Sequence, residues 1–369
     1  MMRALVWVAT GALVLAAVVV SGAVPIGASS GHWAATSWVL DFVKRRSVAT
    51  RALGVDAAPA LDAPALVLAG AAHYERGCSP CHGRPGLRPP VAPARMTPPP
   101  PDLQRQAGRW SAAGLFYVVK HGIKFTGMPA WPARDRDDEV WAVVAFVRRL
   151  PSMTADGYDR LVFADGGRAA AADVVASSGP SSGAASATAR LAATACARCH
   201  GVEGRGRAEP GFPRLAGQQR AYLRESLRAY ADGARHSGIM SPVAASLSEQ
   251  QTHDLAAYFA GLPPVPSLHS SPGSSAAELR QGADIAARGV PDEGVPACLQ
   301  CHAPRGDDRH PGYPILAGQP RHYLERQLQL LSEGRRGGTS YAHIMRQVAS
   351  GLSATQRSAV SAHFAAPVR

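Results

Sequence analysis

Three short segments contain all six cysteines of the chain, and each has the pattern Cys-x-x-Cys-His. They are Cys78-Ser-Pro-Cys81-His82, Cys196-Ala-Arg-Cys199-His200 and Cys298-Leu-Gln-Cys301-His302. Positions three apart lie on one face of a helical turn. Two thiols placed in this way can form thioethers with the two vinyl groups of one porphyrin, while the adjacent imidazole ligates the iron. The pattern therefore predicts three covalently bound haem c groups.

Other uses of paired cysteines fit the spacing less well. Structural zinc sites need two ligand pairs at defined spacing, whereas each pair here lies about 100 residues from the next. Thioredoxin-like redox chemistry needs a strand–helix–strand setting, which the sequence lacks. Structural disulfides give no reason for a histidine after every second cysteine.

Each iron also needs a ligand opposite its histidine. One methionine follows each motif at a similar distance, 46, 40 and 43 residues after the histidine: Met128, Met240 and Met345. A thioether ligand raises the reduction potential relative to a second histidine and closes the iron to substrates. We predict these three methionines as the distal ligands, each in a loop just before the last helix of its unit.

Rival residues lie near these positions. Met96 is close to His82 within a proline-rich stretch, and Met153 follows the last helix of the first unit. Three histidines, His121, His236 and His343, are expected to lie at the surface or to contact a propionate, although His343 is only two residues from the predicted methionine ligand.

The proximal histidines are expected to donate their Nδ1–H to a backbone carbonyl, the usual support of an iron-ligating imidazole. Pro213 and Pro314 follow their histidines by 13 and 12 residues and are placed to supply that carbonyl. In the first unit the acceptor is one of four consecutive prolines, 98–101, and the sequence does not distinguish among them.

An internal repeat organises the second half of the chain. Phe212-Pro-Arg-Leu-Ala-Gly-Gln218 recurs as Tyr313-Pro-Ile-Leu-Ala-Gly-Gln319, at an offset of 101 residues. Each unit is expected to contain a short helix leading into the haem motif, a middle helix, the methionine loop and a final helix. The predicted final helices span Asp137–Leu150, Ser248–Leu262 and Ser353–Phe364. Stretches rich in Ala, Ser, Gly and Pro predict flexible linkers at 152–185 and 263–275.

Composition excludes several classes of protein. With 46% hydrophobic and 18% charged residues, the chain is too apolar to be disordered. The net charge of +12 is spread thinly, without a run of five or six like charges, which argues against nucleic-acid binding. No phosphate-binding glycine loop or catalytic triad is present, so no small-molecule substrate is predicted.

The N-terminus predicts a membrane anchor. Residues 4–24 carry no charge and follow Arg3, which favours a cytoplasmic N-terminus and exported domains. A signal sequence cleaved near Ser21-Gly-Ala23 is the alternative. The following segment, 29–65, contains Trp33 and Trp38 and is expected to lie beside the membrane.

These motifs resemble class I c-type cytochromes. Residues 186–366 resemble the dihaem cytochromes c4, and residues 66–151 resemble monohaem modules with a Thr-Gly-Met-Pro-Ala-Trp loop. The resemblance implies an all-α fold of three tandem cytochrome domains, 66–151, 186–262 and 276–369, behind the N-terminal segment 1–28. It also implies a bacterial inner-membrane protein whose haem domains face the periplasm and carry single electrons between respiratory complexes towards a terminal oxidase.

Two other functions stay open at this point. The chain is alternatively a cytochrome subunit that accepts electrons from the catalytic subunit of a membrane-bound dehydrogenase. A dihaem peroxidase-like enzyme needs an open iron, against which the three predicted methionine ligands argue. The expected partners are an oxidase, a quinol-oxidising complex or a dehydrogenase, and Lys120 and Lys124 are expected to surround the exposed edge of the first haem.

Overall fold

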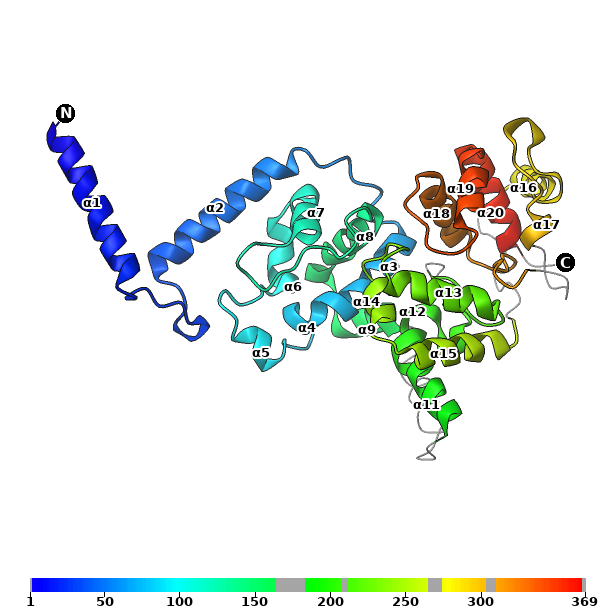
Figure 1. Cartoon of the computed structure of the whole chain (residues 1–369), viewed down its shortest axis with the longest axis horizontal. Coiled ribbons are helices and arrows are strands. Elements are labelled where there is room, and N and C mark those ends of the chain that lie inside the picture. The colour runs from blue at the N-terminus through cyan, green and yellow to red at the C-terminus, as the bar shows by residue number, and fades with distance from the viewer. Residues whose placement is uncertain (1, 164–182, 208–211, 265–273, 303–309, 367–369) are drawn as a thin grey trace.

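The computed structural model describes residues 2–163, 183–207, 212–264, 274–302 and 310–366. In these residues the chain is helical, as predicted, and its extended pairing is limited to two isolated bridges, Arg84–Leu87 and Val290–Val295. Helix α1 (Met2–Val20) and helix α2 (Ala34–Ala52) precede three helical units (Figure 1). Every residue of α1 is exposed, whereas α2 packs on the first unit and buries Val48 there.

The first unit contains seven helices and its own hydrophobic core. They are α3 (Pro64–His73), α4 (Ser79–His82), α5 (Val91–Ala94), α6 (Leu103–Gln106), α7 (Ala112–His121), α8 (Asp137–Val147) and α9 (Ala155–Phe163). Helices α3 and α8 cross so closely that a Cβ on Gly70 would overlap the carbonyl of Ala142. Helix α8 begins at Asp137, as predicted from its acidic first turn, because negative charge is favoured at a helix N-terminus.

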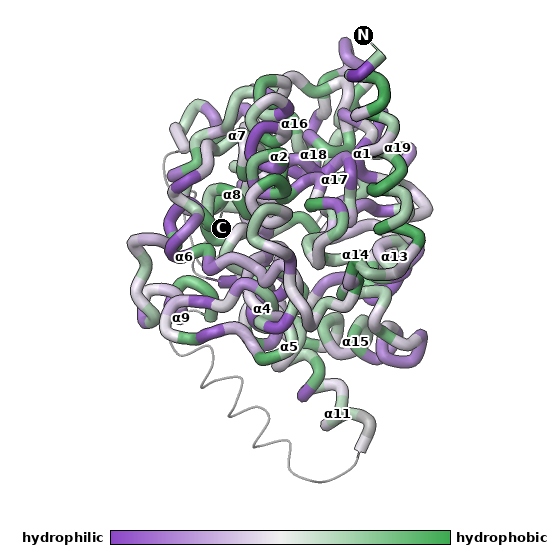
Figure 2. Tube along the Cα trace, turned by 90° about the vertical axis from the view of Figure 1, so that its left-hand side faces the viewer, coloured by the Kyte–Doolittle hydropathy of each residue, from purple (hydrophilic) through white to green (hydrophobic). Residues whose placement is uncertain are grey.

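The second and third units repeat one plan. The second contains α11 (Ala184–Leu191), α12 (Ala197–His200), α13 (Arg220–Ala231), α14 (Met240–Ala245) and α15 (Glu249–Gly261). The third contains α16 (Ala276–Arg288), α17 (Leu299–His302), α18 (Arg321–Ser332), α19 (Ala342–Ser350) and α20 (Ala354–Ala365). The final helices begin after Ser248 and Ser353, each in a capping box with the glutamine three residues later. Figures 1 and 2 show α11 extending away from the rest of the molecule.

The start of the predicted 152–185 linker is instead a helix. Tyr158 and Val162 of α9 are completely buried in the core of the first unit, and the Tyr158 hydroxyl donates to Glu75 over 2.6 Å. Arg207 of the second unit donates to the carbonyls of Leu161 and Val162 at the C-terminus of α9, over 2.7 and 2.9 Å. This helix therefore joins two units, because its apolar face and its free C-terminal carbonyls both find partners. Residues 164–182 of the predicted first linker and 265–273 of the second lie outside the described residues.

Candidate haem sites

Each Cys-x-x-Cys-His motif folds into a single helical turn. Helices α4, α12 and α17 contain the second cysteine and the histidine, while the first cysteine directly precedes the turn or opens it. In the first two units the turn follows a π-helical segment, Tyr74–Cys78 and Ala192–Cys196, a feature frequent at functional sites. In the third unit α16 ends at Arg288, ten residues before Cys298. None of the six cysteines is paired with another in a disulfide, so each is available for attachment to a porphyrin.

The three motif histidines make the same hydrogen bond. The Nδ1 atoms of His200 and His302 lie 2.8 Å from the carbonyls of Pro213 and Pro314, which confirms the predicted acceptors. In the first unit, His82 Nδ1 lies 2.9 Å from the carbonyl of Pro101, the last of the four candidate prolines. A carbonyl only accepts, so Nδ1 carries the proton and Nε2 is left free to ligate iron.

Burial disfavours the thiolate form of the first cysteine in each motif. Burial raises the pKa of Cys78 and Cys196 to about 12 and that of Cys298 above its usual value. A zinc ligand or a redox-active thiol has to lose its proton easily, whereas a thioether carries no charge into an apolar site. Among the residues that the structure describes, no cluster of three His, Cys, Asp or Glu side chains is arranged to hold a metal ion by itself. The donor set thus fits covalent haem better than zinc.

One large cavity connects the second and third motifs. Its volume is about 1570 Å³, and its lining includes both motif histidines together with Met240 and Met345. Each of these methionines therefore faces the same space as the histidine of its own unit. They lie on short helices, α14 and α19, and not in the predicted loops. Met128 lies in a loop after α7, where Thr126 Oγ1 accepts a hydrogen bond from its backbone N–H over 3.1 Å.

The structure separates the rival residues. Met96 lies beside Gly127, one residue before Met128, so it is a neighbour of the predicted ligand despite its distance in sequence. Met153 packs on the core of the first unit, and His236 lies 2.6 Å from Asp135. His121 and His343 are exposed.

The repeated glutamines join the second unit to the third. Gln218 donates to the carbonyl of Ile315 over 3.0 Å and accepts from its N–H over 2.8 Å. Gln319 makes the reciprocal pair with Arg214, at 2.9 Å to the carbonyl and 3.0 Å from the N–H. Both glutamines are buried. Arg214 and Ile315 directly follow the prolines that support the histidines, so each glutamine fixes the proximal loop of the other unit.

Two arginines at the same 101-residue offset extend this interface into the cavity. Arg235 is buried and donates to Ser226 and Gln327 over 3.1 and 3.2 Å, while Arg336 donates to the Tyr222 hydroxyl over 2.9 Å. Burial alone raises the pKa of Tyr222, but the guanidiniums of Arg336 and Arg235 outweigh it and hold that pKa below the usual range. This excess of positive charge suits the two propionates of a haem. Sequence reasoning missed both arginines, although their offset matches that of the glutamines.

The two lysines that are expected near the first haem have different surroundings. Lys120 pairs with Asp137 over 2.5 Å within the chain, so its charge is not free to meet a partner. Lys124 is exposed and stands next to Phe125, which is completely exposed. An exposed aromatic beside a lysine still leaves a surface on which another protein can dock.

Comparisons with known proteins agree with this donor set. Residues 65–147 match the family described as cytochrome c oxidase, cbb3-type, subunit III, and residues 185–263 match the family described as cytochrome c. A thiosulfate dehydrogenase electron acceptor from Thiomonas intermedia (strain K12) is 37% identical over 174 residues, 47% of this chain and 79% of that protein. Cytochrome c4 from Pseudomonas aeruginosa is 36% identical over 174 residues, 47% of this chain and 83% of that protein.

Among solved structures, reduced recombinant cytochrome c4 from Pseudomonas stutzeri is 32% identical, with a TM-score of 0.45 over 51% of this chain and 100% of that chain. The resemblance predicted from the haem motifs and the repeated loops is confirmed. The chain belongs to the c-type cytochromes, related both to dihaem cytochromes c4 and to a monohaem oxidase-type module, and it is an electron-transfer protein that binds haem c covalently.

Proposed function

We propose that this chain is a membrane-anchored periplasmic cytochrome with three haem c groups, which passes single electrons between respiratory complexes towards a terminal oxidase. The observation that carries the proposal is the threefold recurrence of a Cys-x-x-Cys-His turn with a proline carbonyl on its histidine. The domain boundaries 66–151, 186–262 and 276–369 are part of the proposal, with the first domain extended to Phe163 by the packing of α9.

The residues of the chain bind, orient and insulate the haem. The cysteine pairs 78/81, 196/199 and 298/301 provide the attachment, and His82, His200 and His302 provide the proximal nitrogen. Met128, Met240 and Met345 provide the distal sulfur. Bound haem supplies reversible one-electron chemistry at iron, and the protein tunes its potential through ligand identity, burial and hydrogen bonds.

Attachment to the membrane is assigned to α1. It spans Met2–Val20, has a mean hydropathy of 2.2 and buries none of its residues against the rest of the chain. Nineteen residues at about 1.5 Å each are close to the length that crosses the hydrocarbon core. Trp33, Trp38 and Phe42, all exposed near the start of α2, are suited to the membrane–water interface. An anchor keeps the haem units close to membrane partners.

Two partners are supported by different observations. The match of residues 65–147 to subunit III of cbb3-type oxidases favours an oxidase as the electron acceptor. The likeness to thiosulfate dehydrogenase electron acceptors favours the second candidate, a cytochrome that takes electrons from a dehydrogenase subunit. The two roles differ in which protein reduces the chain.

The haem assignment is tested with the full chain in membranes. Replacing each cysteine pair by alanine is expected to lower the haem-to-protein ratio from three to two. Each of Met128→Ala, Met240→Ala and Met345→Ala is expected to remove one third of the long-wavelength sulfur-to-iron absorption of the ferric protein, while Met153→Ala and Met96→Ala leave it intact. Full absorption in Met128→Ala together with loss of one third in Met96→Ala would reassign the first ligand. Reduction by a quinol-oxidising complex or by a dehydrogenase with its substrate then separates the two roles.

A further inference from the structure

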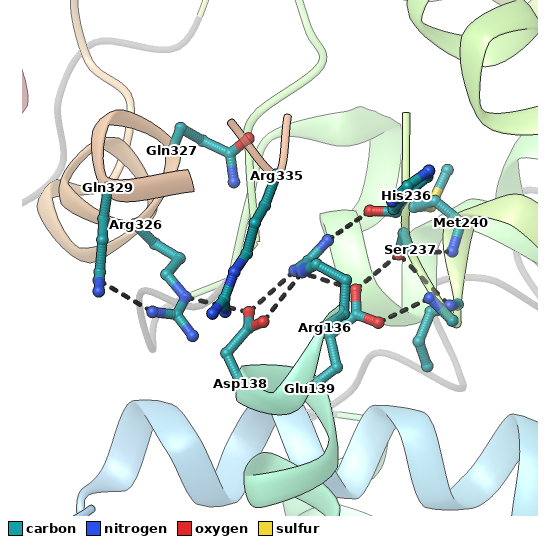
Figure 3. Close-up of polar contacts among 12 residues, drawn as sticks. Arg136, Asp138, Glu139, His236, Ser237, Met240, Arg326, Gln327, Gln329 and Arg335 are labelled. Carbon is teal, nitrogen blue, oxygen red and sulfur yellow. Dashed lines mark hydrogen bonds and ion pairs between the residues drawn. The ribbon is translucent and has the colours of Figure 1, made fainter. Parts of the chain in front are cut away.

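A buried carboxylate lies where the first unit meets the other two. Glu139, in the first turn of α8, is only 6% exposed. Its oxygen Oε1 accepts from Ser237 Oγ over 2.7 Å and pairs with Arg136 over 3.0 Å. Oε2 accepts from the N–H of Gly238 over 2.6 Å and from the indole N–H of Trp131 over 3.2 Å. Figure 3 shows this carboxylate between Arg136 and the segment of His236 and Ser237.

The donors to Glu139 come from both methionine segments. Trp131 follows Met128 by three residues, while Ser237 and Gly238 precede Met240 by three and two residues. The Ser237 hydroxyl also accepts from the backbone N–H of Met240 over 3.1 Å. A continuous chain of hydrogen bonds therefore runs from Glu139 through Ser237 to the backbone of Met240.

The two segments also touch directly. A Cβ on Gly238 would overlap the indole ring of Trp131, so the glycine lets this ring lie flat against the second unit. Arg136 strengthens the junction by donating to the carbonyl of His236 over 2.6 Å. The position of one segment consequently fixes the position of the other.

The neighbouring carboxylate makes different contacts and offers a comparison. Asp138 is also buried at its side chain, and it pairs with Arg136 over 2.9 Å and with Arg326 of the third unit over 3.0 Å. Its recorded partners include no residue of either methionine segment. Loss of Asp138 thus removes none of the hydrogen bonds from the methionine segments to Glu139, and it acts on these segments only indirectly, through Arg136.

We propose that Glu139 is a positioning residue shared by two haems: it holds the segments of Met128 and Met240 together and so keeps both sulfurs on their irons. The proposal rests on the proposed ligation by these two methionines. The third unit is outside this device, because in the part of the chain that the structure describes no hydrogen bond joins Glu139 to the segment of Met345.

Glutamine in place of Glu139 tests this geometry. It keeps the size of the side chain but turns one acceptor oxygen into an N–H2 group, which then faces donors. A hydrogen bond to a charged group contributes enough that its loss changes an equilibrium by about tenfold or more. A methionine that is held less firmly leaves iron more often, and an added neutral ligand captures the open state in proportion to its population.

The experiment is an imidazole titration of the ferric full chain, with Glu139→Gln compared with Asp138→Asn. The haems are distinguished in the same ferric protein by the NMR signals of the methionine methyls, each assigned by its loss in Met128→Ala, Met240→Ala or Met345→Ala. Glu139→Gln is expected to raise the imidazole affinity of the first and second haems about tenfold, equivalent to about 1.4 kcal/mol, and to leave the third unchanged. Asp138→Asn keeps one acceptor oxygen for Arg136, so its effect on the first two haems is expected to be clearly smaller than that of Glu139→Gln.

Two further results decide the proposal. Ser237→Ala removes only the hydroxyl between Glu139 and Met240, so it is expected to raise the imidazole affinity of the second haem alone. This variant also tests the proposal if Glu139→Gln folds poorly. Equal effects of Glu139→Gln and Asp138→Asn, or an effect of Ser237→Ala spread over all haems, would overturn the positioning role while the ligands stand. If all three methyl signals persist in Met128→Ala and in Met240→Ala, the ligation and this inference are overturned together.

Discussion

Replacing Gln319 by alanine should loosen the second unit, although the residue belongs to the third. The change removes two hydrogen bonds between the Gln319 side chain and the backbone of Arg214. The N–H and the carbonyl of Arg214 then stay buried without these partners. A buried polar group that loses its partner costs about 1–3 kcal/mol, so the two together should lower the free energy of unfolding by about 2–5 kcal/mol. For a pair of units of this size, that corresponds to a decrease of about 5–15 °C in the melting temperature.

Calorimetry of the oxidised full chain measures this effect, and a redox titration adds a second readout. Arg214 follows Pro213, the acceptor of the His200 Nδ1–H, so Gln319→Ala should also shift the potential of the haem on His200. Gln218→Ala should lower the free energy of unfolding less in the Gln319→Ala variant than in the unchanged chain, because the first substitution has already weakened the interface. The matched control is Gln250→Ala, which removes one exposed hydrogen bond of 2.8 Å. Equal melting temperatures for Gln319→Ala and Gln250→Ala would refute the reasoning.

Three further changes test other parts of the structure. Gly238→Ala should destabilise docking of the first unit by about 1–3 kcal/mol, because its Cβ overlaps Trp131, whereas Gly261→Ala, with open space around it, should be neutral in the same unfolding assay. Burial, with a smaller effect of Arg136, lowers the pKa of His73 to about 3. As the pH falls from about 6.5 towards 3, the unfolded chain binds a proton that the folded chain rejects, so His73→Phe should gain about 1.4 kcal/mol of relative stability per pH unit in that range, measured by denaturation at several pH values. Arg235→Gln should lower the potential of at least one haem in a redox titration, because positive charge near the porphyrin disfavours the ferric state.

Local sequence patterns correctly predicted the parts of the fold that depend on residues close together in the chain. Ser248 and Ser353 precede a glutamine at the third helical position, and both helices begin where this pattern places them. The Cys-x-x-Cys-His turns and the proline acceptors of the second and third units are also local features. In the first unit, four consecutive prolines, 98–101, could supply the carbonyl, and the sequence does not distinguish among them. Only the folded path of the chain shows that Pro101 is the acceptor.

Other parts of the structure depend on partners far away in the chain. Helix α9 lies in the first part of the predicted 152–185 linker, yet Tyr158 fills a site between Tyr74 and Phe146, with ring centroids 6.3 and 5.8 Å away. The helices that contain Met240 and Met345 are six and nine residues long, too short for a strong periodic signal. Tertiary packing decides such segments, and single-sequence patterns do not contain that information.

The acidic first turn of α8 illustrates the limit most clearly. Asp137, Asp138 and Glu139 satisfy the same local rule, since each is favoured by the positive end of the helix. In the folded chain their partners differ: Asp137 pairs with Lys120 of its own unit, Asp138 with the third unit, and Glu139 with the second. Three residues that are equivalent by sequence thus have three separate roles.

The molecule joins its units in two physically different ways. The second and third units meet through a repeated pair of contacts, in which Gln218 bonds Ile315 and Gln319 makes the equivalent bonds to Arg214, while Arg235 and Arg336 add hydrogen bonds to different partners. The first unit is attached through Arg136, Asp138 and Glu139, which have no counterpart in the repeat. Breaking one of these unique contacts therefore leaves no equivalent contact to compensate, whereas each contact of the repeated pair has a second copy. It follows that a single substitution in the first turn of α8 should undock the first unit from the other two more readily than any single substitution undocks the second unit from the third.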